Sequence, residues 1–234
     1  MKIARIGTVL LVSSLLSIYT QNMLVTPTAQ AESYVAAEVG YAFPQSLMNG
    51  KVTQDQIGGL DISDQPLKNS PLFGVKLGHY FSRARWIGIE TEVTYSNPHV
   101  KQGSLTFSGP GGQATSPELA GLTQRMITWA PLTLLVRYPG QRIQPYLGVG
   151  PAVFFARLQG PTAPPGQSGT AIGLNAEGGV RYLITRHWTL FGEGKYNRAR
   201  IGYTSNDSDP NADPFGFRAT YSVFIVTFGI GYNF

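Results

Sequence analysis

The chain has 234 residues, of which 13% are charged, about half the usual share for a soluble domain. Cysteine is absent, which excludes a disulfide framework, a thiolate metal site and a cysteine nucleophile. The formal net charge is +5, but the basic residues are scattered along the chain instead of clustered, so we expect no nucleic-acid partner.

The N-terminal segment reads as a targeting sequence. Lys2 and Arg5 begin an apolar run over residues 6–18 that is too short to cross a bilayer. Ala29 and Ala31 supply the small residues of a signal-peptidase site. We therefore predict a signal peptide over 1–31 and one domain over 32–234. A retained anchor is the alternative, although a spanning helix needs about 20 apolar residues.

After this segment, polar and apolar residues alternate with period two, and helical periodicity is absent. Each such segment has one apolar face and one face carrying charge or glycine, as in a strand between lipid and a polar interior. Eight strands are predicted, at about residues 33–43, 72–81, 86–96, 123–138, 144–157, 171–184, 188–197 and 224–234.

The predicted fourth strand contains Pro131, which cannot donate to a ladder and indicates a bulge. Its alternation places Arg125, Thr133 and Arg137 inward. The residues predicted to face lipid are Met126, Ala130, Leu132, Leu134, Val136 and Tyr138.

Long and short connections alternate. The long ones are 44–71, 97–122, 158–170 and 198–218, and the short ones are 82–85, 139–143 and 185–187. Outer-membrane barrels have short periplasmic turns and longer external loops, and an open sheet edge is costly in hydrocarbon. The fold class predicted is therefore all-β: an eight-stranded antiparallel up-and-down transmembrane β-barrel in the bacterial outer membrane, with both termini periplasmic.

Several motifs resemble a known family. The stretches Pro145-Tyr146-Leu147-Gly148-Val149-Gly150, Gly178-Gly179-Val180-Arg181-Tyr182 and Leu190-Phe191-Gly192-Glu193-Gly194-Lys195-Tyr196 are similar to strands of the small outer-membrane β-barrel family that includes the OmpA transmembrane domain and OmpX-like proteins. Gly194 stands where members of that family usually have an aromatic residue. The C-terminal Phe228, Ile230, Tyr232 and Phe234 resemble the signal read by the outer-membrane assembly machinery.

The resemblance implies a monomer surrounded by the lipid bilayer and lipopolysaccharide, with the assembly machinery as a partner during biogenesis. Members of the family serve as anchors, adhesins, narrow pores and lipid-modifying enzymes, so fold alone does not decide the activity.

A charge network is predicted in the lumen, because eight strands leave an interior that side chains just fill. Five acids and five bases are expected to face inward. They are Glu38, Lys76, Glu90, Glu92, Arg125, Arg137, Glu177, Arg181, Glu193 and Lys195. A salt-bridged plug is one interpretation, since buried charges need partners. A gated ion or proton path is the other.

No catalytic, cofactor or metal site is predicted. The histidines His79, His99 and His187 do not form the His-x-Ser arrangement of barrel deacylases, and no nucleophile elbow or phosphate-binding loop occurs. Asp207, Asp209, Asn211 and Asp213 have the alternate oxygen ligands that suit a hard cation. However, Ala212 stands where an EF-hand calcium loop has its turn glycine, and Arg218 stands where it has its bidentate acid. These departures favour a solvated loop without a bound ion.

The function predicted is a non-enzymatic outer-membrane protein with a plugged, charge-paired lumen. Its four long extracellular loops would carry any contact with an extracellular ligand. A narrow ion-conducting pore and a lipid A-modifying enzyme are the alternatives.

Overall fold

The computed structural model describes residues 32–52, 60–101, 104, 106–109, 112–115, 122–160, 167–204 and 216–234. The expected cleavage site at Ala29 and Ala31, and the oxygen-rich residues Asp207, Asp209, Asn211 and Asp213, lie outside these ranges. Among the described residues, no helix is long and apolar enough to cross a membrane.

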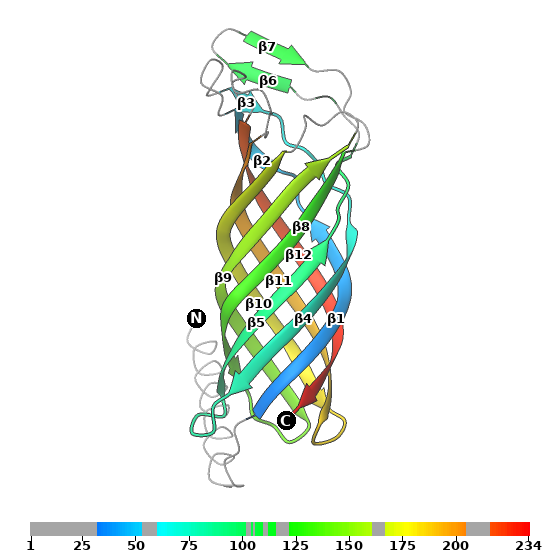
Figure 1. Ribbon diagram of the computed structural model, residues 1–234, viewed down its shortest axis with the longest axis vertical. Helices are drawn as coiled ribbons and strands as arrows, with labels where there is room; N and C mark the ends of the chain where they lie inside the picture. The colour runs from blue at the N-terminus through cyan, green and yellow to red at the C-terminus, as the bar shows by residue number, and fades with distance from the viewer. Residues whose placement is uncertain are drawn as a thin grey trace, which may run out of the picture.

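Eight long strands form a closed antiparallel ring (Figure 1), which confirms the predicted fold class. Each strand pairs with the next one along the ring, and the last pairs with the first. The ring consists of β1 (Glu32–Pro44), β4 (Ser70–Tyr80), β5 (Ile87–Ser96), β8 (Thr123–Arg137), β9 (Ile143–Gln159), β10 (Ser168–Leu183), β11 (Trp188–Thr204) and β12 (Gly216–Asn233).

Closure between β1 and β12 is continuous from the pair Tyr34 and Asn233 to the pair Pro44 and Val223. No register shift interrupts it. Because this seam supplies partners for the backbone groups of both strands, the ring leaves no strand edge open along its length.

Four short strands lie beyond the ring, at the end of the barrel that we call the loop end (Figure 1). They fall in segments expected to be loops: β2 (Met48–Val52) and β3 (Asp61–Ile62) in 44–71, and β6 (Thr106–Gly109) and β7 (Gly112–Thr115) in 97–122. β2 pairs with the start of β12, so this small sheet continues the barrel wall. The opposite end, with the short connections, is the turn end.

The expected loops 158–170 and 198–218 are both shorter than predicted. β9 runs to Gln159 and β10 begins at Ser168, while β11 runs to Thr204 and β12 begins at Gly216. The added part of β11 still alternates, but its outer face is basic instead of apolar. Ala199, Ile201 and Tyr203 are buried inside, while Arg198 and Arg200 are exposed outside. A strand whose apolar face points inward does not match the lipid-facing pattern.

The bulge predicted at Pro131 is present, as the β8–β9 register shifts between Trp129 and Leu134. A one-residue slip turns every following side chain to the other face. Met126 and Ala130 are therefore buried and Arg125 is exposed, which corrects their predicted orientations. The orientations beyond the bulge, such as exposed Leu134 and buried Thr133, are as predicted.

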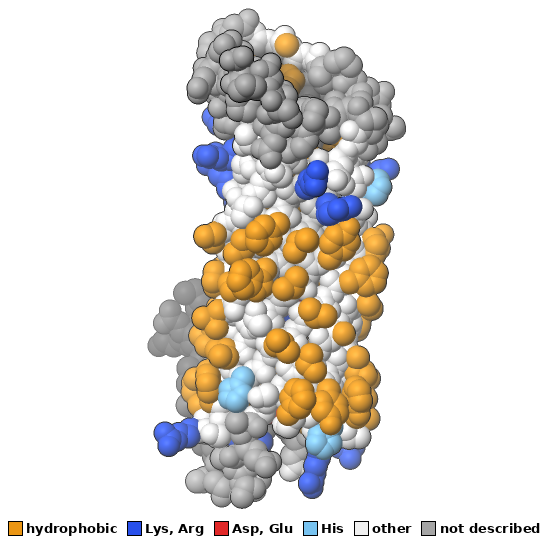
Figure 2. All heavy atoms as spheres, in the orientation of Figure 1, with side chains coloured by type: hydrophobic (Ala, Val, Ile, Leu, Met, Phe, Trp, Pro, Cys, Tyr) orange, Lys and Arg blue, Asp and Glu red, His pale blue; other side chains and the backbone are white. Residues whose placement is uncertain are grey.

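The barrel buries side chains inside and exposes apolar ones outside (Figure 2). In the half nearer the loop end, the lumen contains a cluster of apolar and aromatic residues that we call the apolar plug. Its most buried members are Ala42, Met126, Ala152, Phe154, Ile201, Tyr203 and Tyr221. A smaller cluster lies toward the turn end and consists of Tyr34, Ala36, Tyr80, Leu135, Tyr146 and Phe191.

The orientation of β8 before the bulge can be tested with single cysteines, since the chain has none of its own. A spin label at Ile127→Cys should collide readily with lipid-soluble oxygen, because Ile127 is 39% exposed. The same label at Met126→Cys, which is 1% exposed, should be shielded in the folded barrel. Greater oxygen accessibility at position 126 than at 127 would show that the bulge is misplaced.

Candidate functional site

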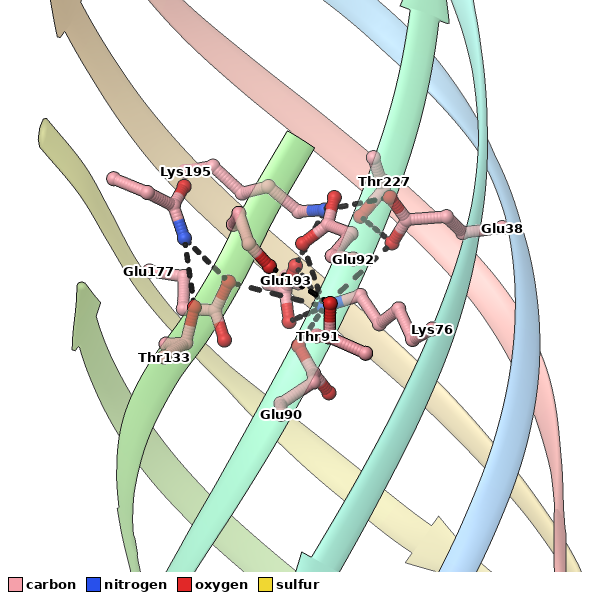
Figure 3. Close-up of polar contacts among 12 residues, drawn as sticks. Glu38, Lys76, Glu90, Thr91, Glu92, Thr133, Glu177, Glu193, Lys195 and Thr227 are labelled. Carbon is pink, nitrogen blue, oxygen red and sulfur yellow. Dashed lines mark hydrogen bonds and ion pairs between the residues drawn. The ribbon is translucent and has the colours of Figure 1, made fainter. Parts of the chain in front are cut away.

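Five glutamates and two lysines converge at mid-height in the lumen (Figure 3). Their side chains are at most 5% exposed. We call them the lumen charge cluster: Glu38 on β1, Lys76 on β4, Glu90 and Glu92 on β5, Glu177 on β10, and Glu193 and Lys195 on β11. All seven were predicted to face inward, and the alternation of each strand places them there.

Lys76 lies at the centre of the cluster. Its Nζ donates to both carboxylate oxygens of Glu193, at 2.8 and 2.9 Å, and to Oε1 of Glu90 at 3.1 Å. An oxygen of Glu92 lies at 3.4 Å, and oxygens of Glu38 and Glu177 lie at 3.9 Å. One ammonium group thus lies within 4 Å of five carboxylates from four other strands, β1, β5, β10 and β11.

Lys195 joins the same carboxylates from the other side. Its Nζ lies 2.5 Å from Oε1 of Glu38 and 3.1 Å from Oε1 of Glu193, and it also donates to Glu92. Together the two lysines connect β1, β4, β5, β10 and β11 by ion pairs in the barrel interior.

Glycines on the inner wall make room for these side chains. A Cβ added at Gly74 would lie 2.6 Å from Oε1 of Glu38, and one at Gly148 would lie 2.8 Å from Cγ of Glu177. Gly74 is the register partner of Glu38, and Gly148 that of Glu177. Glu38 and Glu177 therefore each lie over a glycine of the neighbouring strand, where any larger side chain would displace the carboxylate.

The predicted lumen balance of five acids and five bases is wrong, because Arg125 is absent from the lumen and Glu32 is present. Arg137 and Arg181 are buried inside the barrel as predicted, but they lie apart from the lumen charge cluster, which has only two bases. Arg125 is exposed on the outer wall for the reason given above. Neutral donors serve some of the remaining oxygens: Tyr34 donates to Glu90, Tyr146 to Glu193, and Thr227 to Glu38 at 3.2 Å. Oε1 of Glu177 has no hydrogen-bond partner among the described residues.

Arg137 and Arg181 form a separate cluster nearer the turn end. Their NH2 groups lie 2.7 and 3.1 Å from the carboxylate oxygens of Glu32. The Arg137 guanidinium lies over the Tyr80 ring at 3.5 Å, a favourable cation–π contact. Glu32 was missed in the sequence because it is the first residue after the predicted signal peptide, where the alternation only begins.

A metal site is not indicated by the three acids that could form one. Oxygens of Glu90, Glu92 and Glu177 all lie within 4.8 Å of one another. However, the Lys76 ammonium is 3.1, 3.4 and 3.9 Å from these three carboxylates, so this position already holds a cation. A second positive charge here would be repelled by the first.

One serine–histidine contact was also missed, because its partners are 46 residues apart. Ser33 Oγ lies 2.9 Å from Nδ1 of His79, across the β1–β4 ladder. In hydrolases the base is in turn oriented by a third group. No described acid contacts His79, so the pair is best explained as a cross-strand hydrogen bond.

The residues of the expected C-terminal assembly signal lie on β12 and just after it. Phe228, Ile230 and Phe234 are exposed on the outer wall. Tyr232 is half-buried, with its ring 5.2 Å from Trp188 and 5.5 Å from His187. Their recognition by the assembly machinery stays a prediction.

The match to a family model decides the classification. The model for the outer membrane protein beta-barrel domain matches residues 8–234, almost the whole chain. The chain belongs to this family. As a member, it is an outer-membrane β-barrel protein that lies in the lipid bilayer. No curated protein sequence is significantly similar to it.

Solved structures of other outer membrane proteins have the same fold at low sequence identity. The outer membrane protein OprG of Pseudomonas aeruginosa is 14% identical, with a TM-score of 0.61 over 88% of this chain and 97% of that chain. The outer membrane protein AlkL, determined in lipid bilayers, is 16% identical, with a TM-score of 0.53 over 90% and 93% of the two chains. At such identities the likeness extends to the fold alone.

Removing the central ammonium should destabilise the barrel strongly. Lys76→Met leaves the Glu193 and Glu90 carboxylates without the ammonium group nearest to each, and breaking a buried pair costs about 3–5 kcal/mol. Urea unfolding of the refolded protein in lipid vesicles measures the loss. The exposed Lys68→Met is the matched control and should stay within about 0.5 kcal/mol of the parent.

Glu177→Gln offers the opposite test in the same assay. Since Oε1 of Glu177 lacks a partner and acids outnumber bases, losing this charge should cost far less than losing Lys76. Equal destabilisation by the two variants would contradict the charge balance described here.

Proposed function

We propose that this protein is a non-enzymatic outer-membrane scaffold whose lumen is closed to ions and whose loop end faces outside the cell. The apolar plug is the observation that carries the proposal. Phe154, Ile201 and Tyr221 are at most 1% exposed and fill the lumen between the lumen charge cluster and the loop end. An ion entering from that end would meet side chains that offer little to replace its hydration shell.

Close packing below the plug supports the same conclusion. A cavity beside Lys76, Glu90 and Arg181 measures only about 10 Å³, room for about one water molecule. Both lysines of the lumen charge cluster contact several carboxylates at once. An ion could pass only by separating these pairs in a region without bulk water.

The loop end has the features of a surface for contacts. β11 and β12 rise beyond the other strands, and β2, β3, β6 and β7 extend the wall from them (Figure 1). Three of the four connections at this end are long, whereas the turn end has only short ones. Long external loops and short periplasmic turns are usual in outer-membrane barrels, so binding to an external partner would occur here.

A narrow pore is the second candidate. It is favoured by two groups of charged side chains that follow one another along the lumen, Glu32 with Arg137 and Arg181 and then the lumen charge cluster. Planar-bilayer recordings distinguish the two functions. For the purified full chain we expect no resolved single-channel current, because the apolar plug blocks hydrated ions. Discrete currents that disappear in Glu193→Gln would overturn the closed lumen and establish the pore.

A further inference from the structure

Five arginines lie on the outer wall at the loop end, and we call them the arginine belt. They are Arg125 on β8, Arg157 on β9, Arg198 and Arg200 on β11, and Arg218 on β12. All are exposed. Figure 2 shows basic side chains gathered just beyond the hydrophobic band on the face that it draws. They contribute nothing to the lumen or to the apolar surface.

Arg125 and Arg157 are direct cross-strand partners in the β8–β9 ladder. Side chains in such positions start about 5 Å apart, and like charges directly opposite one another are destabilising. On the other side of Arg157, the exposed Ser168 of β10 is its register partner and carries a hydroxyl group. Two guanidinium groups and a hydroxyl thus lie side by side on an open surface.

The second group lies on the other side of β10 from the first and consists of Arg198, Arg200 and Arg218. Arg198 and Arg200 share the outer face of β11, and Arg218 pairs in register with Gly202 of that strand. Nε of Arg218 lies 3.9 Å from the place that a Cβ on Gly202 would occupy. The Arg218 side chain therefore lies over Gly202, on the strand that carries Arg198 and Arg200.

No described acid neutralises the belt. None of its five members forms an ion pair with another described residue, whereas Lys51 is 3.3 Å from Asp61. The other acids of the described strands are inside the barrel or at its turn end. Positive charge is thus concentrated without a counter-charge from this part of the chain.

The belt begins where the apolar surface ends. Ile127 and Phe155, two residues from Arg125 and Arg157 on the same faces, are 39% and 41% exposed. On β11, exposed Tyr196 precedes Arg198 in the same way. Side chains at this level meet the headgroups of the lipids whose chains cover the band below. Arginine suits phosphate in particular, because its planar fork can donate two parallel hydrogen bonds.

We propose that the arginine belt binds the phosphate groups of lipopolysaccharide in the outer leaflet, with Arg125 and Arg157 sharing one phosphate. The shared anion removes the repulsion between the two guanidinium groups. This inference rests on the proposed orientation, in which the loop end faces outside. It assigns a ligand to a surface that the closed lumen and the loops do not use.

Native mass spectrometry of the detergent-purified full chain, titrated with bis-phosphorylated lipid A, tests the proposal. Arg125→Gln/Arg157→Gln should lower the apparent affinity by about tenfold or more, since hydrogen bonds to charged groups are lost. Arg83→Gln/Arg186→Gln removes two exposed arginines from the turn end and should bind like the parent. Heat-modified gel mobility confirms that each variant is folded.

The lipid sets a second comparison. Removing the phosphates from lipid A should weaken its binding to the parent at least as much as removing Arg125 and Arg157 weakens the binding of bis-phosphorylated lipid A. Phosphatidylglycerol should bind the parent more weakly than bis-phosphorylated lipid A does. Equal affinity of the parent and that variant, or indifference to the phosphates, would overturn the proposal. An equal loss in the Arg83/Arg186 variant would do the same, because it would mean non-specific charge attraction.

Orientation is checked separately with a membrane-impermeant maleimide on intact cells. Ser104→Cys at the loop end should react, and Gln141→Cys in a short turn should be protected. The reverse pattern would overturn the proposed function as well as the inference. The expected labelling together with unchanged lipid A binding would overturn the inference alone.

Discussion

The requirement that every backbone polar group in hydrocarbon has a partner determines the rest of this structure. It closes the sheet through the continuous β1–β12 seam and removes the open edge. A ring of eight strands leaves space only for side chains. The inward residues of every strand therefore meet one another instead of water, and charged residues among them must find partners inside the lumen. Lys76 and Lys195 are the partners that the barrel provides.

The interior is layered along the barrel. Glu32, Arg137 and Arg181 are nearest the turn end, the lumen charge cluster follows, and the apolar plug fills the half toward the loop end. The outer wall has its own order, with an apolar band that gives way to the arginine belt. Near the loop end the usual alternation is inverted, since the strands there are apolar inside and basic outside. This inversion is what we expect of strands that leave the hydrocarbon while their inner faces remain packed against the apolar plug.

Period-two alternation was sufficient to predict the eight strands and the inward direction of nine of the ten expected lumen charges, because alternation is a local property of each strand. Closure of the ring followed from the cost of an open sheet edge in hydrocarbon. Arg125 was misplaced because Pro131 slips the register by one residue, and the sequence shows a bulge without showing which half of the strand it reverses. The extension of β11 was missed because its apolar residues face inward. The pairing of Glu32 with Arg137 and Arg181, and the two-lysine balance of the cluster, depend on contacts between distant strands that no local pattern contains.

Ring closure is the central claim, and cross-linking across the seam tests it most directly. Val39 on β1 and Phe228 on β12 are register partners that face lipid, 57% and 66% exposed. Oxidation, or a short bismaleimide, should join Val39→Cys to Phe228→Cys in the folded, membrane-inserted protein, while Val39→Cys with Leu190→Cys on β11 stays unlinked. Linkage of the second pair, or a folded barrel in which the first pair cannot be joined, would contradict a ring closed in this register.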